Sequence, residues 1–364
     1  MKVQRMAEGV VLAAAMLLAA AMAVVVAKGM PLTDKDLESE ASMWSLYERW
    51  RSVHTVSLDL EEKERRFETF KENARYINEF NKRKDVPYKL GLNQFSDLTL
   101  EEFTSMYTGA LPEDVDANSD DDTSLASAVT SSDEQPLVSA GDVPDVWDWR
   151  EHGAVTPVKN QGKCGSCWAF SMVASVEGIN AINTKTLLTL SEQEVLDCSG
   201  YGDCKGGHTY DSFLHAIDHG LAVDSLGNPP YYPPYVAEQE DCRFDPNKLP
   251  VVKIDSRKRM NYTNEAALKF RVYEQPVSVR VDSNSTDFKN YKEGVFTGPC
   301  GTKLKHAMLV VGYGTTADRT DYWIVKNSWG TRWGDNGYIR MKRDVGTEEG
   351  LCGIYKSPMY PIKN

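Results

Sequence analysis

The 364-residue chain has no excess of basic residues. Its 53 acidic residues outnumber its 41 Lys and Arg residues, and the formal net charge is -12. Nucleic acids are bound by clustered Lys and Arg side chains, so this charge balance argues against a nucleic-acid partner.

Long apolar runs are missing after the first 27 residues. Residues 9–27 carry no charge and follow Lys2 and Arg5, a pattern typical of a signal peptide with cleavage after Ala23 or Ala27. The stretch approaches the ~20 residues that span a bilayer, so an uncleaved anchor is the competing interpretation. We expect a signal peptide over residues 1–27, entry into the secretory pathway and no stable membrane anchor.

Cysteine is absent from the first 160 residues. An odd number of cysteines in an oxidising compartment leaves one thiol unpaired, and the other six allow 15 pairings. The seven cysteines are Cys164, Cys167, Cys198, Cys204, Cys242, Cys300 and Cys352.

Composition divides the chain into parts. Residues 37–81 have a charged, helical pattern, and residues 89–97 have a strand-like pattern that ends in a turn. Residues 112–140 are rich in Asp, Ser, Thr, Ala and Pro, which is typical of an unfolded linker. Tryptophans and cysteines then arrive together, as expected of a dense, disulfide-linked domain. We predict a helical domain over 28–111, an acidic linker with a processing site over 112–141, and the main domain over 142–364.

The predicted secondary structure of the main domain differs between its two halves. Its first half contains helical patterns over 167–179 and around 191–197, and its second half contains short β-branched or aromatic segments over 276–281, 307–313 and 322–326. This order predicts a helical lobe facing a β lobe, with a cleft between them.

Cys167 is placed to be a reactive thiol. It opens the first predicted helix, and a helix N-terminus together with an imidazolium can lower a cysteine pKa from ~8.5 to ~3–4. The alternative reading of Cys164 and Cys167 is a redox pair or half of a zinc site. Cys198 and Cys204 have the wrong spacing for the other half, while His215 and His219 have suitable spacing but are expected on a helix surface. No metal or cofactor is expected.

The segment Gln161–Phe170 reads QGKCGSCWAF and resembles the nucleophile segment of papain-like cysteine proteases. Further matches cover 142–364 in the family's order: SEQE at 191–194, CKGG at 204–207, HA at 306–307 and NSWG at 327–330. The resemblance implies an α+β protein with a papain-like two-lobe fold, a helical lobe and an antiparallel β-barrel lobe with the active-site cleft between them, preceded by a mainly helical propeptide domain.

The same resemblance implies roles for single residues. Cys167 is the nucleophile, His306 its base, Asn327 the residue that orients the imidazole, Gln161 a donor to the oxyanion, and Trp329 a shield over the His–Asn hydrogen bond. Four other histidines in this half are candidates by residue type alone: His152, His208, His215 and His219. The implied disulfides are Cys164 with Cys204, Cys198 with Cys242, and Cys300 with Cys352.

Two motifs precede this domain. The first follows one helix face at intervals of three or four residues and resembles the ERFNIN motif of cathepsin L-like propeptides; its residues are Glu62, Arg66, Phe70, Asn73, Ile77 and Asn81. The second resembles the GxNxFxD motif of the same propeptides, with Gly91, Asn93, Phe95 and Asp97. The implied propeptide sends an extended segment through the cleft to block Cys167. Carboxylates in its ion pairs lose their charge as pH falls, so we expect activation in acid, which an activation rate that stays flat between pH 7 and pH 4.5 would contradict.

The resemblance also places the substrate site, beside Trp329 and the Gly206–Gly207 pair. The implied pocket for the side chain two residues before the cut is lined by His208, Thr209, Arg280, Leu304, Ala307 and Ser357. Arg280 and Lys305 are more basic than the family's usual residues there, so we expect weaker preference for bulky apolar side chains and tolerance of acidic ones. The alternative is that Arg280 points to solvent. No large insertion blocks the cleft, which favours an endopeptidase.

The remaining expectations concern partners and modification. We expect protein and peptide substrates, a monomer, cystatin-type inhibitors by resemblance, and a vacuolar, lysosomal or extracellular location. N-glycosylation patterns begin at Asn261 and Asn284. The competing function is a catalytically silent binding or inhibitory protein of the same fold.

Overall fold

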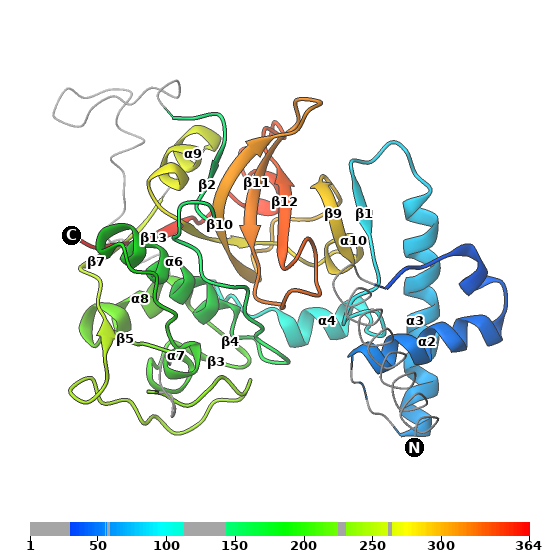
Figure 1. The fold of residues 1–364 in the computed structure, drawn as a ribbon, viewed down its shortest axis with the longest axis horizontal. Helices are drawn as coiled ribbons and strands as arrows, with labels where there is room; N and C mark the ends of the chain where they lie inside the picture. The colour runs from blue at the N-terminus through cyan, green and yellow to red at the C-terminus, as the bar shows by residue number, and fades with distance from the viewer. Residues whose placement is uncertain (1–29, 55, 57–58, 113–142, 225–230, 261–263) are drawn as a thin grey trace, which may run out of the picture. The chain divides into compact units, whose positions relative to one another are not determined.

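The computed structural model describes residues 30–364 except 55, 57–58, 113–142, 225–230 and 261–263 (Figure 1). The expected signal peptide, most of the expected linker and the Asn261 glycosylation pattern lie outside the described residues. The described chain forms two compact units, one of residues 30–85 and 89–99 and one of residues 86–88 and 100–364. Among the helices of the described part, none has the length and apolar character needed to cross a membrane.

The first unit is built on two amphipathic helices. After the short η1 (Asp34–Leu37) come α2 (Glu40–His54) and α3 (Leu60–Asn81), so the predicted helical stretch of residues 37–81 is interrupted between the two. Asp59 caps the N-terminus of α3, since its side chain accepts a hydrogen bond from the Glu62 N–H. The buried aromatic faces of the helices pack together, with Tyr47 and Phe70 ring centroids 5.0 Å apart.

The two propeptide-like motifs contact each other inside this unit. Asn73 on α3 donates to the carbonyl of Ser96 at 2.9 Å, and Asn81 donates to the carbonyl of Leu90 at 2.8 Å. Phe70 and Ile77 contribute to the core, as does Phe95 from the turn. The first residue of β1 (Tyr88–Leu90) belongs to the second unit with residues 86–87, and the chain returns to the first unit for residues 89–99.

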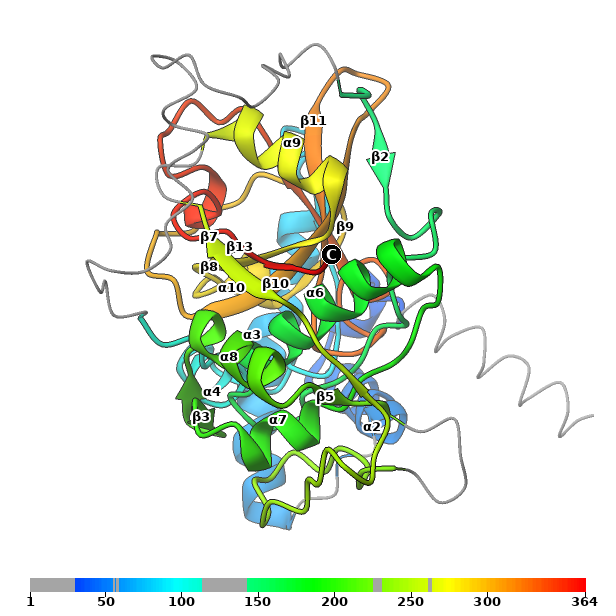
Figure 2. The ribbon, with the colours of Figure 1, turned by 90° about the vertical axis from the view of Figure 1, so that its left-hand side faces the viewer.

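The second unit has a helical side around α6 (Cys167–Thr184). This helix is buried almost all round over its first four turns, because α7 (Glu192–Cys198) and α8 (Thr209–Asp218) pack against it on one side and the large sheet on the other (Figure 2). Short strand pairs complete this side: β3 (Gly202–Asp203) with β4 (Gly206–Gly207), and β5 (Leu221–Ala222) with β6 (Val251–Val252).

The other side of the unit is the large sheet, in which neighbouring strands run in the order β9-β12-β11-β10-β8-β13-β7 (Figure 1). The strands are β7 (Ser256–Arg259), β8 (Val277–Val281), β9 (Tyr291–Phe296), β10 (His306–Thr315), β11 (Asp321–Lys326), β12 (Tyr338–Lys342) and β13 (Met359–Ile362), and β2 (Trp147–Asp148) also pairs with β10. The helical elements beside the sheet are α4 (Leu100–Tyr107), α9 (Glu265–Glu274), α10 (Thr286–Lys289) and η2 (Leu351–Gly353). The pairing is antiparallel except between β9 and β12, which are parallel.

The central strand β10 sets the geometry of the site. All of its residues but the last are buried, because α6 covers one face of the sheet. Its first residues lie opposite β8, with Ala307 facing Arg280, and Leu309 faces Lys326 at the end of β11. The predicted strands over 276–281, 307–313 and 322–326 are therefore confirmed to within two residues.

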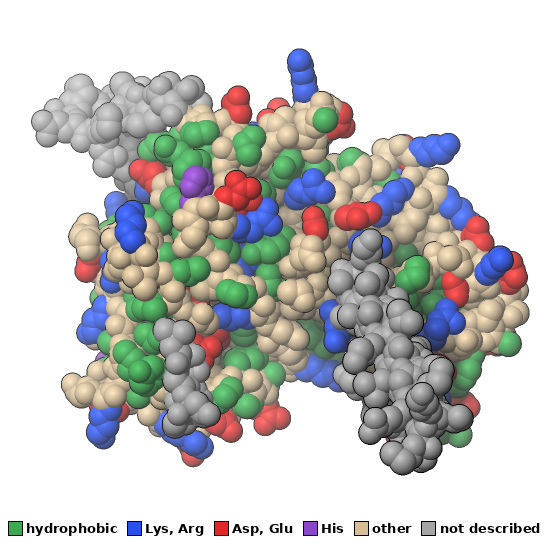
Figure 3. All heavy atoms as spheres, in the orientation of Figure 1, with side chains coloured by type: hydrophobic (Ala, Val, Ile, Leu, Met, Phe, Trp, Pro, Cys, Tyr) green, Lys and Arg blue, Asp and Glu red, His purple; other side chains and the backbone are tan. Residues whose placement is uncertain are grey.

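Three disulfides link segments of the second unit. They join Cys164 to Cys204, Cys198 to Cys242 and Cys300 to Cys352, the same pairs that the resemblance implies. Cys167 is the free cysteine of the described chain. Acidic and basic side chains are interspersed over the face drawn in Figure 3.

Candidate active site

Cys167 is the first residue of α6 and is fully buried. The helix N-terminus would favour a thiolate at this position. Burial nevertheless raises the pKa of the thiol to about 11, although backbone N–H groups that include those of Ala307, Gly109 and Ala110 point toward the sulfur and oppose the shift. The thiol of Cys167 therefore stays protonated as long as it is buried.

His306, Asn327 and Trp329 contact one another at the start of β10. His306 opens β10 and Asn327 directly follows the neighbouring strand β11, so the antiparallel pairing brings them together. The His306 Nε2 lies 2.8 Å from Asn327 Oδ1, and the same oxygen accepts the Ser328 N–H at 2.8 Å. Because Oδ1 is an acceptor, Nε2 carries the proton and Nδ1 is left with its lone pair. The Trp329 ring lies on the imidazole with centroids 4.4 Å apart.

The histidine is uncharged in this arrangement. His306 is fully buried, and burial lowers its pKa to about 4, while the hydrogen bond to Asn327 opposes the shift. The adjacent residue, Ala307, packs against Cys167. The residue next to His306 in the strand therefore contacts the residue that carries the thiol.

Gln161 lies in the loop before α6 with its side chain fully buried. Its amide nitrogen donates to the carbonyls of Cys164 at 2.7 Å and Tyr107 at 3.3 Å, and its amide oxygen accepts from the Ser328 hydroxyl at 2.6 Å. These contacts tie the loop that precedes Cys167 to the segment that carries Asn327.

Residues 108–112, which we name the occluding segment, cover the thiol. Gly109 N–H and Ala110 N–H both donate to the Lys305 carbonyl at 2.9 Å, Leu111 N–H donates to the Gly207 carbonyl at 3.0 Å, and Gly207 N–H donates to the Gly109 carbonyl at 2.8 Å. The Ala110 side chain packs against Cys167. The segment is thus bound as an extra strand-like piece between the two sides of the unit.

The occluding segment is held in place by α4, the helix before it. The ring of Phe103 meets the ring of Trp329 edge-on, with centroids 5.0 Å apart. Trp329 Nε1 donates to the Tyr107 carbonyl at 3.2 Å. A separate contact comes from residues 86–88, where the Tyr88 hydroxyl donates to Asp287 at 2.5 Å and the Pro87 carbonyl accepts from the Val295 N–H.

The residues expected to bind substrate lie around this segment. Gly206 and Gly207 form β4, and a Cβ at Gly207 would come within 2.4 Å of the Trp168 indole, so only glycine fits there. His208 is the half-buried N-cap residue of α8 and Thr209 is fully buried at its first position. Leu304 lines an open groove beside the segment.

Arg280 does not point to solvent. Its side chain is buried, donates to the Leu111 carbonyl, and donates to the Ser357 hydroxyl at 3.3 Å. The alternative that the sequence left open is therefore wrong. Register explains the placement, because Arg280 on β8 lies directly opposite Ala307 on β10, which itself contacts the nucleophile.

Two expectations on histidine and cysteine are corrected or resolved by the structure. His215 does not lie on a helix surface: it is buried and paired with Glu194. Cys164 is bonded to Cys204, so it forms neither a redox pair nor a zinc site with Cys167.

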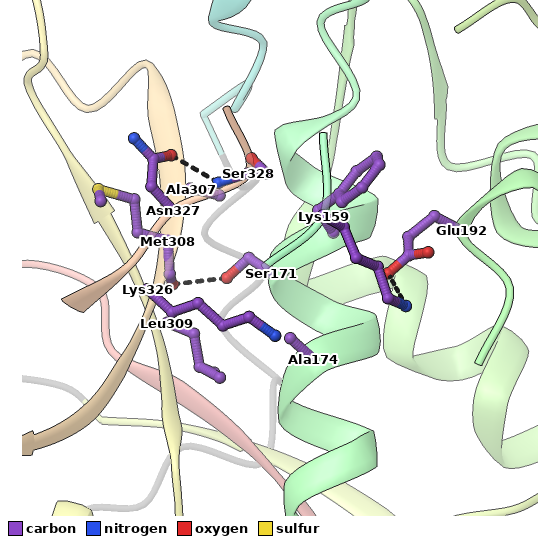
Figure 4. Close-up of a pocket in the computed structure, with 11 residues that line it drawn as sticks. Lys159, Ser171, Ala174, Glu192, Ala307, Met308, Leu309, Lys326, Asn327 and Ser328 are labelled. Atoms are coloured by element: carbon purple, nitrogen blue, oxygen red, sulfur yellow. Dashed lines mark hydrogen bonds and ion pairs between the residues drawn. The ribbon is translucent and has the colours of Figure 1, made fainter. Parts of the chain in front are cut away.

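A group of buried charges near Asn327 was not foreseen, and Figure 4 shows Lys159, Glu192 and Lys326 from it. Lys159 contacts Glu177 at 2.9 Å and Glu192 at 2.6 Å, and Lys326 donates to Thr156, which in turn donates to Glu177. A small cavity beside them is also lined by Ala307, Asn327 and Ser328. We name Lys159, Glu177, Glu192 and Lys326 the buried charge cluster.

Burial governs the protonation of this cluster. It raises the pKa of Glu192 to about 7 and lowers that of Lys326 to about 8. Burial acts the same way on Glu177, but the two lysines more than offset it and lower its pKa. The only hints in the sequence are a glutamate inside an apolar helix and a lysine ending an apolar strand, which do not say that the two meet.

Comparisons with known proteins agree with this geometry. Residues 143–362 match the model of the papain family cysteine protease, and residues 47–103 match the cathepsin propeptide inhibitor domain. The thiol protease SEN102 of Hemerocallis is 46% identical over 341 residues, which are 93% of this chain and 91% of that protein. The cysteine proteinase EP-B 1 of Hordeum vulgare is 45% identical over 349 residues, covering 94% and 91% of the two chains.

Solved structures of related precursors superpose on this chain. A recombinant stem bromelain precursor superposes with a TM-score of 0.77 at 41% identity, covering 88% of this chain and 99% of that one. The proform of the ragweed pollen allergen Amb a 11 superposes with a TM-score of 0.76 at 38% identity, covering 92% and 98%. The predicted papain-like α+β fold with a helical propeptide region is confirmed. The chain belongs to the papain family of cysteine proteases, as a cysteine endopeptidase zymogen that carries a cathepsin-type propeptide inhibitor domain.

Proposed function

We propose that Cys167 and His306 hydrolyse peptide bonds as a thiolate–imidazolium pair once the occluding segment has been removed. The thiolate attacks the scissile carbonyl carbon, and His306 gives its proton to the leaving amine. A water molecule then loses a proton to His306 and attacks the thioester, which releases the acid and restores the thiolate–imidazolium pair. Asn327 keeps the imidazole turned toward the sulfur through its bond to Nε2.

Gln161 supplies a hydrogen-bond donor to the oxyanion in this proposal. Its amide nitrogen already donates to the Tyr107 carbonyl of the zymogen, and that hydrogen becomes available when the residue leaves. The Cys167 N–H, at the start of α6, is the second donor. One such donor is worth about 3 kcal/mol in the transition state.

The zymogen is inactive in this proposal because the Cys167 thiol and the His306 imidazole are both uncharged. In the zymogen burial raises the pKa of Cys167 to about 11 and lowers that of His306 to about 4, so the thiol and the imidazole are both neutral between these values. A neutral thiol is a weak nucleophile. Removal of residues 108–112 admits water, which favours the charged pair that catalysis needs.

Activation is proposed to occur in acid, at a lower pH than the sequence suggested. The carboxylate of Glu62 bonds Arg65 and Arg66, and these hydrogen bonds lower its pKa to about 2. The pKa of Glu48 is also lowered, first by its bond to Lys63. A carboxylate with a lowered pKa stabilises the fold above its unfolded value of 4.5 and loses that effect only as pH falls below it. We therefore expect these ion pairs to weaken below about pH 4.5 rather than between pH 7 and 4.5.

The proposal extends to the domain boundaries, the location and the partners of the protein. We propose a signal peptide over 1–27, a propeptide over 28–111, processing within 112–141 and a monomeric catalytic domain over 142–364. The secretory pathway would deliver it to a vacuole, a lysosome or the extracellular space, where cystatin-type inhibitors are the expected partners. Asn284 is exposed and accepts a hydrogen bond from Thr104, so a glycan there would compete with α4 for the groove.

The observation that carries this proposal is an unpaired thiol at a helix N-terminus, covered by the chain's own Ala110 and packed against Ala307, which directly follows the Asn327-bonded His306. The test is to incubate the purified proprotein at pH 4–5 with a thiol reductant and follow cleavage of a peptide substrate. We expect activity as the ~140-residue front is lost, abolition by an epoxide that alkylates Cys167, and no activity from Cys167→Ser. A processed protein whose Cys167 is labelled but which cleaves no peptide would instead support the catalytically silent alternative.

A further inference from the structure

We propose that Arg280 selects substrates that carry a carboxylate side chain close to the scissile bond. The inference rests on the proposed function, because it names the substrate class of the same cleft. It starts from the placement of Arg280, a buried arginine one strand away from the residue that contacts the nucleophile.

The guanidinium reaches the bound chain itself. Arg280 Nη1 donates to the carbonyl of Leu111, whose neighbour Ala110 packs on Cys167. Arg280 therefore contacts the occluding segment at Leu111, the residue that follows the one packed on Cys167. A substrate in the same place would bring a side chain, as well as its backbone, within reach of the guanidinium.

The contacts of Arg280 favour an anion over a neutral group. In the zymogen the contacts of Arg280 include two neutral oxygens, since its Nη1 bonds the Leu111 carbonyl and its Nη2 bonds the Ser357 hydroxyl. Removal of the segment takes the Leu111 carbonyl away. A carboxylate can then accept from the planar guanidinium through two oxygens, and such charge-assisted bonds are about twice as strong as neutral ones. An apolar side chain would instead have to lie against a cation.

The groove beside the occluding segment carries positive charge, as the Arg280 guanidinium does. Its volume is about 720 Å³, and eight of the residues that line it belong to the stretch 101–112, which activation removes, including its only carboxylate, Glu101. The five that remain are Lys205, Asn284, Lys303, Leu304 and Lys305. The three lysines are exposed, and none of them makes an ion pair with a residue that the structure describes.

Two nearby carboxylates reduce the positive charge of this rim but accept backbone N–H groups and do not pair with its lysine side chains. Asp203 accepts the Lys205 N–H at 2.6 Å, and Asp282 accepts the backbone N–H groups of Asn284 at 3.1 Å and Lys303 at 3.0 Å. Their oxygens are thus directed at the backbone. A protein of net charge -12 therefore keeps a cationic stretch along its substrate groove.

The chain's own sequence fits such a cleft. Directly after Pro112 it continues with Glu113, Asp114 and Asp116. An acidic continuation of the segment that occupies the groove is the charge complement of the lysine rim, and it would be a favourable early substrate.

The experiment uses the activated enzyme and three fluorogenic peptides that differ only in the residue two positions before the cut, the position that the family resemblance assigns to this pocket. The residues are Glu, Gln and Leu, and Glu and Gln have nearly the same shape, so their ratio isolates the charge. Values of kcat/KM are divided by the concentration of active sites titrated with the epoxide. We expect wild-type enzyme to prefer Glu over Gln by about 10-fold or more.

The variants are Arg280→Val, Arg280→Lys and, as a matched control, Arg243→Val, which removes an exposed arginine of the same domain. We expect Arg280→Val to abolish the Glu preference and to favour Leu, Arg280→Lys to keep part of the Glu preference, and Arg243→Val to behave as wild type. The preference should survive 0.5 M salt, since buried pairs are screened little, whereas a preference due to the lysine rim would be lost.

A Glu-to-Gln ratio near one in the wild type, or one that Arg280→Val leaves unchanged, would overturn the inference while the cleavage of the Leu peptide upholds the proposed function. Failure to cleave any peptide by a protein that has lost its front would overturn both.

Discussion

Replacement of Gly109 by alanine should make the Cys167 thiol of the zymogen more accessible without changing any of the proposed catalytic residues. A Cβ atom built on Gly109 would lie 2.0 Å from the Gly165 carbonyl oxygen and 2.8 Å from the Gly165 Cα. Both atoms are backbone, in the loop that precedes the nucleophile, so no side chain can turn away to make room. The occluding segment itself must lift by about 1 Å or more to restore ordinary contact.

The size of the effect follows from the hydrogen bonds that lifting would break. Four backbone bonds hold the segment, between Gly109 or its neighbours and the carbonyl or N–H groups of Lys305 and Gly207. A backbone hydrogen bond contributes about 0.5–1.5 kcal/mol, so loss of two would cost about 1–3 kcal/mol. The population of proprotein with an accessible thiol should then rise about 5- to 150-fold.

The assay is the rate at which the epoxide alkylates Cys167 in intact proprotein at pH 7, read by mass spectrometry so that cleaved molecules are counted separately. Ser105→Ala is the control, since Ser105 lies on the exposed side of α4 and its hydroxyl contacts the Glu102 carbonyl. We expect the control to label at the wild-type rate. A Gly109→Ala proprotein that is folded and labels no faster than wild type would refute the steric argument.

Three further predictions concern other parts of the site. Asn327→Ala removes the partner of His306 Nε2, so kcat should fall about 10- to 100-fold with little change in KM, measured on activated enzyme with titrated active sites. Glu192→Gln should flatten the stability profile: the raised pKa of the buried carboxyl makes the wild type lose unfolding free energy as pH rises from 4.5 to about 7, which urea unfolding of a catalytically inactive background would detect. Tyr88→Phe removes the buried hydroxyl that bonds Asp287, so the propeptide should be lost several-fold faster at one fixed acidic pH, and an unchanged rate would show that this contact contributes nothing to latency.

The elements that the sequence predicts well are those with local signals. The helix that begins at Cys167 is apolar in sequence on the faces that it buries, and β8, β10 and β11 follow from short β-branched runs bounded by Gly or Asn. The break between α2 and α3 was missed, although Asp59 is a typical N-cap residue and could have indicated it.

The parts that the sequence does not predict depend on contacts between distant residues. The burial of Arg280 requires the register of β8 on β10 and the position of Leu111, which lies 169 residues earlier in the chain. Likewise, residues 100–111 were assigned to the propeptide domain, yet in the structure they pack with the catalytic unit. Their sequence is an ordinary short helix followed by small residues, and nothing local in it says which unit they join.

The buried charge cluster has a consequence for how this protein can diverge over time. Its two lysines and two glutamates come from four separate segments, so their charges balance only as a set. Above pH 7, where Glu192 is also ionised, loss of any one charge leaves another buried without compensation, which typically costs 3–5 kcal/mol. Drift at Lys159, Glu177, Glu192 and Lys326 should therefore be concerted, with exchanges in pairs that preserve neutrality, whereas the apolar residues around them can vary one at a time.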